Sequence, residues 1–527
     1  MTNSIREIAG ADFILAIGTN TTETHPVISL QIKKAQSMGA VLAVADPRRT
    51  ELAERADFHL QLRPGTDIAL LNGLAHIIIA EGIWDKEFVE TRTEEFAALR
   101  EMTAAYPPAY VEEITGVPPE TLFRVARGYA SAPKASILYT MGITQHICGT
   151  DNVLAVANLA LLCGQVGRES CGVNPLRGQN NVQGACDMGA LPDVFSGYQR
   201  VDSAENRAKF AKAWSVSKLP ERAGLTVGEM FEAASQGELK GMYIMGENPV
   251  LSDPDAKHVV ESLKKLDFLV VQDIFLTETA ELADVVLPGA SFAEKDGTFT
   301  NTERRVQRVR KAVEPEGEAK ADWEIISLLA SALGCPMGYS SPGEIMEEIA
   351  RYTPSYGGIS YARLESGGLQ WPCPAPDHSG TRFLHEGKFS RGLGIFHPVS
   401  YVPPDEPPDA AYPFVLSTGR RLQHYHTGTM TLRCGALETA YPEGYLEMNG
   451  GDAEKIGVRD GERVKITSRR GSVEAAVMVT ERVRPGLVFT SFHYPEIAVN
   501  RLTNPARDPA AGIPELKICA VRVDKVC

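Results

Sequence analysis

The residues best suited to chemistry lie together in one short segment, residues 174–190. It reads NPLRGQNNVQGACDMGA, with three glycines and a run of side-chain amides around a single arginine, Arg177. Amides both donate and accept hydrogen bonds, which makes the segment poor material for a core or a helix. Glycine lets a backbone approach a large ligand, and arginine offers a planar, permanent cation. The segment predicts a loop that holds a polar ligand and an anionic substrate; an amide-rich surface loop is the alternative.

The overall composition is that of an acidic, globular protein. A chain of 527 residues is long enough for three or four domains that each bury a core. Its 43% hydrophobic and 23% charged residues are ordinary for a soluble protein. The 53 basic and 67 acidic residues give a net charge of −14, and no basic stripe alternates with aromatic residues. We therefore expect no nucleic-acid partner.

The termini, apolar runs and cysteines bear on location. No cationic start followed by an apolar stretch opens the chain, so no signal peptide is visible. The longest apolar runs, 68–80 and 153–163, are interrupted or too short for a membrane span. Nine scattered cysteines without a C-x-x-C pair fit reduced thiols and offer no iron–sulfur motif. We expect a cytoplasmic protein that does not insert directly into a membrane.

A strand–helix–strand unit is predicted near the N-terminus. The apolar run 11–17 is typical of a buried parallel strand, and it leads through Gly18-Thr19-Asn20 into a helical pattern over about 25–38. A second strand, 41–45, ends at Asp46. In such units the first turn faces a nucleotide, and the acid accepts hydrogen bonds from a ribose or a guanine edge. One unit alone is weak evidence, because many α/β folds contain it.

The same unit recurs later in the chain. A strand at 242–245 leads into Gly246-Glu247-Asn248-Pro249, a helical stretch over about 255–265, and a strand at 268–272 that ends in Asp273. Residues 50–57 and 277–284 are identical at six of eight positions, at a constant spacing of 227 residues. Two related halves of this kind suit a ligand with two nucleotide ends. A third strand and polar turn, 135–146, join the first half.

The C-terminal part is predicted to be a small β-barrel. A proline-rich linker precedes it, and short β-rich stretches follow at 445–448, 462–468, 472–480 and 487–492. We interpret 469–471 as a hairpin turn. The His424-x-His426 pair has no third metal ligand nearby, so contact with a polar ligand is favoured over metal binding. The polar run 297–305 is expected to be a solvated turn rather than core.

The order of these segments resembles molybdopterin oxidoreductases of the bis-(guanine dinucleotide) type, most closely the catalytic subunits of formate dehydrogenases. The resemblance covers essentially the whole chain, and the Arg177-Gly178-Gln179-Asn180-Asn181 loop is specific to formate dehydrogenases within that group. It implies an α/β fold with two related doubly wound α/β domains and a C-terminal β-barrel of the double-psi type. We assign the domains as 1–178, 179–395, a linker at 396–413, and the barrel at 414–527.

The resemblance also assigns site residues. Arg177 would hold the formate carboxylate, with Gln179 beside it, and Gly178 would adjoin the cofactor. One arm of the cofactor would be lined by Gly18, Asn20, Asp46, Arg48, Gly65, Asp67, Gly142 and Gln145. The other arm or its surroundings would take Gly246, Asn248, Pro249, Gln272, Asp273, Thr300 and Asn301. The barrel would close over the cofactor with Arg420, His424, Tyr425, Asn504 and Lys517.

The implied cofactor is bis-(molybdopterin guanine dinucleotide) with molybdenum or tungsten, and the implied reaction turns formate into CO₂ and two electrons. In the family an N-terminal [4Fe–4S] cluster and a metal-binding selenocysteine or cysteine come first, and this sequence has neither. We therefore expect the chain to be the downstream part of a selenoenzyme, cut where UGA was taken as a stop. Alone it would not oxidise formate, and it would depend on electron-transfer iron–sulfur or flavin subunits.

Two other functions remain open from the residues. One is another bis-molybdopterin oxyanion reductase, such as a nitrate reductase; the Arg177–Asn181 loop argues against it. The other is a non-catalytic scaffold subunit of an electron-transfer complex, like the large iron–sulfur subunit of respiratory complex I. Retained polar cofactor loops would be unexpected in such a scaffold.

Overall fold

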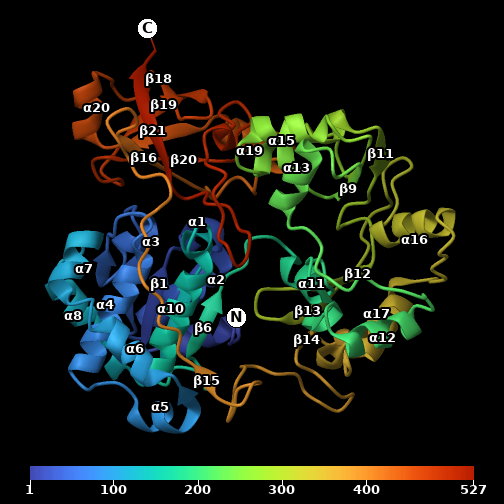
Figure 1. Ribbon diagram of the computed structural model, residues 1–527, viewed down its shortest axis with the longest axis horizontal. Helices are drawn as coiled ribbons and strands as arrows, with labels where there is room; N and C mark the ends of the chain where they lie inside the picture. Colours follow the sequence, from blue (N-terminus) through green and yellow to red (C-terminus); the bar gives the residue numbers. More distant parts are fainter. Residues whose placement is uncertain (527) are drawn as a thin grey trace. The chain divides into compact units, whose positions relative to one another are not determined.

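The computed structural model describes residues 1–526, and the chain forms two compact units (Figure 1). The first unit comprises Met1–Leu176, Leu251–Ala256 and Phe383–Cys527, and the second comprises Arg177–Val250 and Lys257–Arg382. None of the helices within residues 1–526 combines the length and the apolar content that crossing a lipid bilayer requires.

A five-stranded parallel sheet forms the centre of the first unit. Its strand order is β3-β2-β1-β5-β6. The strands are β1 (Phe13–Ile17), β2 (Val41–Ala45), β3 (Phe58–Leu60), β5 (Ala135–Tyr139) and β6 (Gly172–Pro175). All five residues of β1 are buried, as expected for a parallel strand covered on both faces. The strands predicted at 11–17 and 41–45 are confirmed.

Helices cover both faces of this sheet. They are α1 (Thr21–Thr24), α2 (Pro26–Ser37), α3 (Glu51–Glu54), α4 (Asp67–Ala80), α5 (Lys86–Arg92), α6 (Phe96–Thr103), α7 (Pro108–Thr115), α8 (Pro119–Ser131), α9 (Met141–Thr144) and α10 (Gly149–Leu162). Alternate strand residues point to opposite faces. Ile14 and Ala16 of β1 therefore pack with α2, whereas Phe13, Leu15 and Ile17 pack with α4, α8 and α10. The helix predicted over about 25–38 is confirmed as α2.

The same unit ends in a closed six-stranded barrel with the strand order β16-β20-β17-β19-β18-β21. Its strands are β16 (Phe414–Gly419), β17 (Tyr445–Met448), β18 (Arg463–Thr467), β19 (Ser472–Val479), β20 (Leu487–Ser491) and β21 (Cys519–Lys525), with the helices α19 (Gly435–Ala440) and α20 (Gly450–Ile456). The predicted barrel and its hairpin between β18 and β19 are confirmed. The sequence did not indicate β16 and β21, which pair with each other and close the barrel.

The second unit contains a smaller parallel sheet of β9 (Gly241–Met245), β10 (Phe268–Asp273) and β11 (Val285–Pro288). Phe231 of α13 (Val227–Ser235) and Val259 of α15 (Ala256–Leu263) cover one face of it. On the other face Tyr243 and Met245 are 40% and 50% exposed. One face of this sheet is therefore largely uncovered within the described chain.

An antiparallel hairpin and short helices complete the second unit. The hairpin strands β12 (Gly297–Thr300) and β13 (Arg305–Val309) pair with each other, and β13 pairs with β14 (Leu369–Gln370). The remaining elements are β7 (Val194–Phe195), β8 (Gln199–Arg200), α11 (Val182–Asp187), α12 (Ala204–Ala213), α14 (Pro249–Ser252), α16 (Asp322–Ala332), α17 (Pro342–Tyr352), α18 (Tyr361–Leu364) and the 3₁₀ turns Ser196–Tyr198, Ala280–Leu282 and Pro354–Tyr356. The hairpin corrects our expectation of a solvated turn at 297–305, since Arg304 at its tip is only 2% exposed.

The segment boundaries differ from the predicted domains in three places, the first of which is that residues 251–256, assigned to the second α/β domain, belong to the first unit. Residues 383–395, assigned to the second α/β domain, belong to the first unit, because β15 (Gly394–Ile395) pairs with β4 (Thr93–Glu94) and Phe389 packs edge-on against Phe88. The boundary after the first sheet lies between Leu176 and Arg177 rather than after residue 178. For residues 383–395, pairing with a strand that is distant in the chain decides the boundary, and local sequence does not reveal it.

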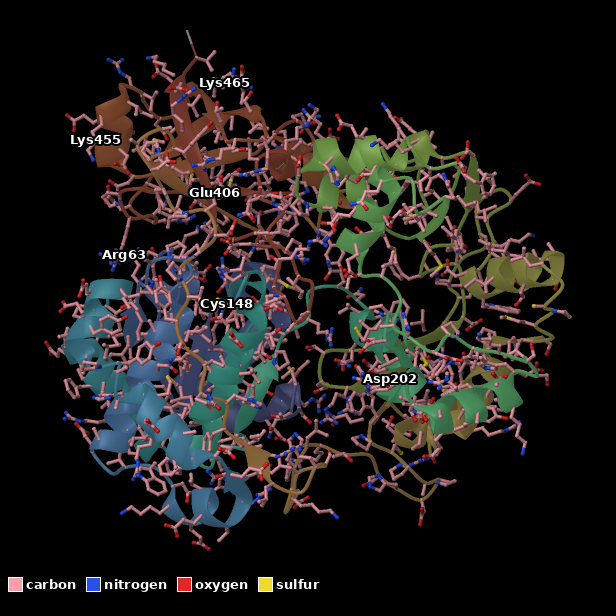
Figure 2. The ribbon with its side chains drawn as sticks, viewed as in Figure 1. Arg63, Cys148, Asp202, Glu406, Lys455 and Lys465 are labelled. Atoms are coloured by element: carbon pink, nitrogen blue, oxygen red, sulfur yellow. The ribbon has the colours of Figure 1, made fainter. Side chains whose placement is uncertain are left out.

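The proline-rich segment is held against its own unit. Val399 is buried, and its carbonyl accepts a 2.9 Å hydrogen bond from Asn72 of α4. Glu406, labelled in Figure 2, is buried and accepts a 2.6 Å hydrogen bond from Arg470 of the barrel. The predicted linker therefore contacts both α4, which covers the parallel sheet, and the barrel.

Candidate functional site

The repeat predicted from the sequence is present in the backbone. In both halves the glycine after the first strand has a positive φ, +56° at Gly18 and +63° at Gly246. Its N–H donates to the end of the neighbouring strand, to Ala45 at 2.9 Å and to Gln272 at 2.8 Å. L-residues rarely adopt this conformation, so glycine is required at both turns. The two turns are built alike.

Two equivalent aspartates brace these halves. Asp57 accepts a 2.8 Å hydrogen bond from the N–H of Leu42, and Asp284 accepts a 2.7 Å bond from the N–H of Leu269. The donors and the acceptors are both 227 residues apart, the spacing found in the sequence. The conserved spacing therefore reflects the same local fold in each unit.

The equivalent asparagines of the two turns differ. The carbonyl oxygen of Asn248 accepts bonds from the N–H and the hydroxyl of Thr279, at 3.2 and 2.7 Å, and its amide donates to Glu278 at 2.9 Å. The amide of Asn20 is buried and finds no partner among residues 1–526, and the same holds for the hydroxyls of Thr19 and Thr21. Leu52 stands where the second half has Thr279. The first turn therefore presents buried polar groups that make no hydrogen bond within residues 1–526, unlike the second turn.

Two further glycines allow close approaches around the first turn. The N–H of Gly142 donates to the carbonyl of Gly18 at 3.1 Å, and a Cβ on Gly142 would lie 2.6 Å from the Gly18 Cα. A Cβ on Gly65 would lie 2.5 Å from Ile518, which follows Lys517 beside the barrel. Gln145 caps the end of α9 and is half-buried. These predicted residues are thus brought to the same region of the first unit.

Charged groups with weakened hydration surround this turn. Burial raises the pKa of both Asp46 and Asp67 to about 6. Burial, and then the neighbouring Arg420 charge, lower the pKa of Lys517 to about 7. Lys517 still donates a 2.8 Å hydrogen bond to the carbonyl of Thr418 in β16. A lysine in this state gains from a bound anion, which restores its charge.

The barrel contributes two neighbouring arginines, Arg420 and Arg421, that pack against tyrosine rings. Burial lowers the pKa of the Arg420 guanidinium, which lies 5.5 Å from the ring of Tyr425. Arg421 stacks 3.3 Å over Tyr445, and its buried Nε and one terminal nitrogen have no partner among the described residues. Arg421 directly follows Arg420 but was not among the predicted site residues. The charge of Arg420 acts on Lys517, and a guanidinium and an ammonium group near each other are suited to phosphate.

Two predicted barrel residues are held by their own chain. The ring of His424 is buried between the hydroxyl of Thr431 at 3.2 Å and the carbonyl of Tyr441 at 2.9 Å. Asn504 donates to the carbonyl of Ile518 at 2.9 Å, which holds the segment that carries Lys517. In residues 1–526 no three His, Cys, Asp or Glu side chains gather as metal ligands.

One buried histidine was not among the predicted site residues. The Nε2 atom of His146 lies 2.9 Å from the carbonyl of Gly142, and its buried Nδ1 makes no hydrogen bond to the described residues. The carboxylate of Glu515 is 3.9 Å from that Nδ1. In the sequence, the feature that could have identified His146 as a site residue is its position at the end of the strand and polar turn 135–146.

Residues 177–181, here called the arginine loop, lie in the second unit. The backbone N–H of Arg177 donates to the hydroxyl of Thr302 at 3.0 Å. Its Nε donates to the Gln183 side-chain oxygen at 3.1 Å, and Nη1 lies 3.4 Å from the sulfur of Cys186. Gln179 is half-buried, and its amide makes no hydrogen bond within the described chain. Gln183 and Cys186 therefore help to orient the Arg177 guanidinium.

The hairpin and the end of β10 carry the other predicted residues of this unit. The N–H of Thr300 donates to Asn181 at 2.9 Å, which attaches the hairpin to the arginine loop. Asn301 closes the hairpin by accepting from the N–H of Arg305 at 3.0 Å. Gln272 is buried and donates to Asp322 at 2.7 Å. Asp273 is the last residue of β10, and Asp46 directly follows the end of β2. Pro249 is the first residue of α14.

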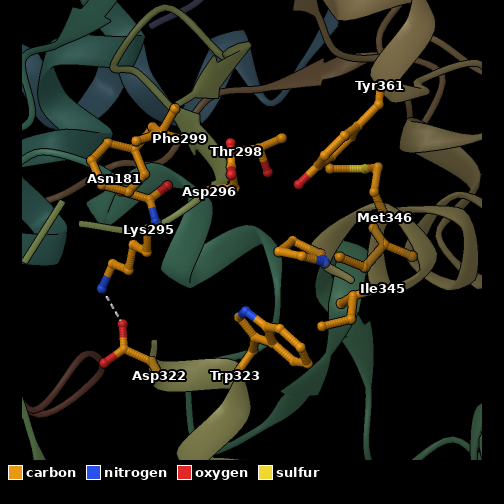
Figure 3. Close-up of a pocket in the computed structure, with 14 residues that line it drawn as sticks. Asn181, Lys295, Asp296, Thr298, Phe299, Asp322, Trp323, Ile345, Met346 and Tyr361 are labelled. Carbon is orange, nitrogen blue, oxygen red and sulfur yellow. Dashed lines mark hydrogen bonds and ion pairs between the residues drawn. The ribbon is translucent and has the colours of Figure 1, made fainter. Parts of the chain in front are cut away.

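A cavity of about 240 Å³ adjoins this hairpin (Figure 3). It is lined by Phe299, Trp323, Met346 and Tyr361, and a Lys295–Asp322 ion pair lies at its edge. No local sequence pattern indicated this cavity, because its walls come from separate segments.

Comparison with known proteins agrees with this geometry. The family model described as molybdopterin oxidoreductase matches residues 1–332, and the one described as molydopterin dinucleotide binding domain matches residues 414–520. The chain is 51% identical over 530 residues to the F420-dependent formate dehydrogenase subunit alpha of Methanocaldococcus jannaschii, covering all of this chain and 78% of that protein.

Two further proteins extend the comparison. Formate dehydrogenase H of Escherichia coli is 41% identical over 532 residues, covering all of this chain and 74% of that protein. Acetylene hydratase from Pelobacter acetylenicus has a TM-score of 0.75 at 22% identity, over all of this chain and 81% of that one, which shows a shared fold. The chain belongs to the molybdopterin oxidoreductase family.

Proposed function

We propose that the chain is the catalytic subunit of a molybdenum- or tungsten-dependent formate dehydrogenase, which converts formate into CO₂, a proton and two electrons. The observation that carries this proposal is the Arg177 loop, because it presents an oriented guanidinium between amides on a short polar turn. Relatives named formate dehydrogenase align over the whole chain at 41–51% identity. An oxyanion reductase or a scaffold subunit fits these observations less well.

The residues of the first unit fit a dinucleotide of molybdopterin. The unpartnered amide of Asn20, the cations Arg420 and Lys517, and the carboxylates Asp46 and Asp67 supply complementary groups for phosphates and a guanine edge. Arg48, Gly65, Gly142, Gln145, His424, Tyr425 and Asn504 would support them. A second arm would be held by Gly178, Gly246, Asn248, Pro249, Gln272, Asp273, Thr300 and Asn301. When bound, the cofactor's metal supplies the two-electron redox chemistry.

The protein's own part in the reaction is to bind and orient formate. A guanidinium can hold both carboxylate oxygens through parallel N–H groups, which fixes the direction of the C–H bond. Arg177 is the residue we assign to this task, with the amide of Gln179 as a neighbouring hydrogen-bond donor. Partner subunits with iron–sulfur or flavin groups would carry the electrons away, in keeping with relatives that are named as alpha subunits.

The test uses the enzyme purified from its source with its natural partners. We expect molybdenum or tungsten by elemental analysis, formate-dependent reduction of a viologen dye, and no nitrate-dependent oxidation of the reduced dye. Nitrate reduction without formate oxidation would assign the protein to the oxyanion reductases. Absence of both metals and both activities would support a scaffold subunit.

A further inference from the structure

A buried carboxylate organises the second unit beneath the arginine loop. Asp187, the last residue of α11, accepts four hydrogen bonds from uncharged donors: Gln183 at 2.8 Å, Tyr198 at 2.8 Å, Tyr356 at 2.6 Å and Trp371 at 2.7 Å. A buried carboxylate is costly to maintain unless its hydrogen bonds are satisfied. A fully satisfied polar network of this kind holds its members in one arrangement.

The network determines which way the Gln183 amide faces. A carboxylate accepts hydrogen bonds and cannot donate them, so the NH₂ group of Gln183 must point at Asp187. The carbonyl oxygen of the same amide then points at Nε of Arg177, which donates to it at 3.1 Å. Gln183 and Asp187 lie one helical turn apart on α11, where such pairs meet.

The two tyrosines keep this polarity fixed. Burial, and then the charge of Asp187, raise the pKa of Tyr198 and of Tyr356, so both hydroxyls remain protonated donors. Tyr198 donates to Asp187 and lies 3.0 Å from the Gln183 nitrogen, from which it accepts. Tyr356 also lies 3.2 Å from the hydroxyl of Thr300, in the hairpin that Asn181 attaches to the loop. The network therefore reaches the arginine loop by two routes.

We infer that Asp187 is a positioning residue for the substrate anion: through Gln183 it sets the orientation of the Arg177 guanidinium. This inference rests on the proposed function, in which Arg177 binds formate. It predicts that removing the charge of Asp187 impairs substrate binding without touching the substrate.

The decisive variant is Asp187→Asn, made in the enzyme with its natural partners. Asparagine keeps the shape of the side chain, but its NH₂ group replaces one carboxylate oxygen. Two positions that accepted hydrogen bonds from the network then become donors, so the Gln183 amide loses its fixed direction. We expect KM for formate to rise roughly 10- to 100-fold, because a misplaced binding group costs about that much, while kcat changes less. Nitrite, an anion of the same shape, should lose affinity as an inhibitor by a similar factor.

Two control variants separate positioning from general damage. Tyr356→Phe removes one donor but leaves the carboxylate and the Gln183 contact, so KM should change about threefold or less. Asp452→Asn replaces another buried aspartate, which accepts from the N–H of Gly486 at 2.6 Å in the first unit. It should lower the melting temperature and leave KM unchanged. An unchanged KM in Asp187→Asn, or an equal rise in Asp452→Asn, would overturn the inference.

A double variant and a structure test the route itself. If Asp187 acts through Gln183, then Gln183→Leu together with Asp187→Asn should be no worse than the worse single variant, and additive losses would contradict that route. A crystal structure of Asp187→Asn should show Arg177 released from Gln183, and an unmoved guanidinium would refute the inference. The position of Arg177 in the crystal is observed without substrate. If the unmodified enzyme failed to oxidise formate, that failure would reject the proposed function but would not decide whether Asp187 positions Arg177.

Discussion

Arg48 and Glu447 are 399 residues apart in the chain, and they form a buried two-pronged ion pair. Nε and Nη2 of Arg48 donate to the two carboxylate oxygens at 3.0 and 2.7 Å. The guanidinium also lies 3.5 Å over the ring of Phe489 in β20. This pair joins the loop after β2 to β17 of the barrel, so it holds two predicted cofactor-binding regions together.

Removing one partner of this pair should be costly. We expect Glu447→Ala to lower the free energy of unfolding by about 3 to 5 kcal/mol, because it leaves a buried charge without its counterion. Denaturant unfolding of the chain prepared without cofactor measures it. Glu462→Ala, which breaks an exposed pair with Lys525, is the control and should lower the free energy of unfolding far less, because solvent screens that pair. Equal effects of the two variants would contradict the assigned role.

The two turn asparagines should respond in opposite ways. Asn248→Ala removes three internal hydrogen bonds, so it should destabilise the cofactor-free chain by about 1 to 3 kcal/mol. Asn20→Ala removes none and should leave that stability nearly unchanged, but it should lower the metal bound per purified enzyme. Thermal unfolding and elemental analysis of both variants make the comparison. If Asn20→Ala lowered the stability and Asn248→Ala did not, that result would contradict the structure.

Lys517 should behave as an unusually reactive amine. Its pKa is lowered to about 7, so in the cofactor-free chain much of it is neutral at pH 7.5. Acylation of Lys517 should therefore rise with a midpoint near pH 7, whereas the exposed Lys455 (Figure 2) serves as the ordinary comparison. Bound cofactor should suppress the labelling. Peptide mass spectrometry reads the rates, and a midpoint above pH 9 would exclude the proposed environment.

The buried Asp67 should make stability depend on pH. Its folded-state pKa is raised from 3.8 to about 6, so its contribution is fully present below about pH 3.8 and is lost as the pH rises through 6. Asp67→Asn stays neutral and should melt higher than wild type at pH 8, with the gain disappearing toward pH 4. Glu81→Gln, an exposed carboxylate in an ion pair, should show no such gain. A gain independent of pH would refute the assignment.

Arg177 should be required for substrate binding. In the complete enzyme, Arg177→Ala is expected to raise KM for formate and to lower kcat/KM by orders of magnitude. Arg177→Lys should recover little, because an ammonium group lacks the planar fork. Arg200→Ala removes an exposed arginine of the same unit, paired with Asp202, and should leave both parameters unchanged. Near-normal kinetics in Arg177→Ala would remove the central residue of the proposed function.

Short-range features of this protein could be predicted from the sequence. The strands β1 and β2, the glycine turn after β1 and the two strand–helix–strand units follow from local patterns of apolar residues and turn residues. The arginine loop could be recognised for the same reason, because its amides and glycines are contiguous. Each of these features depends on residues that are neighbours along the chain.

Tertiary structure decided the features that depend on distant partners. The pairing of β15 with β4 moves residues 383–395 into the first unit, and β16 with β21 closes the barrel. Burial of Arg304 and the four donors around Asp187 come from segments scattered over the second unit. Polarity alone predicted solvent exposure for such residues. A charged side chain is stable inside a protein only when folding brings partners to it, and those partners cannot be identified from its neighbours in sequence.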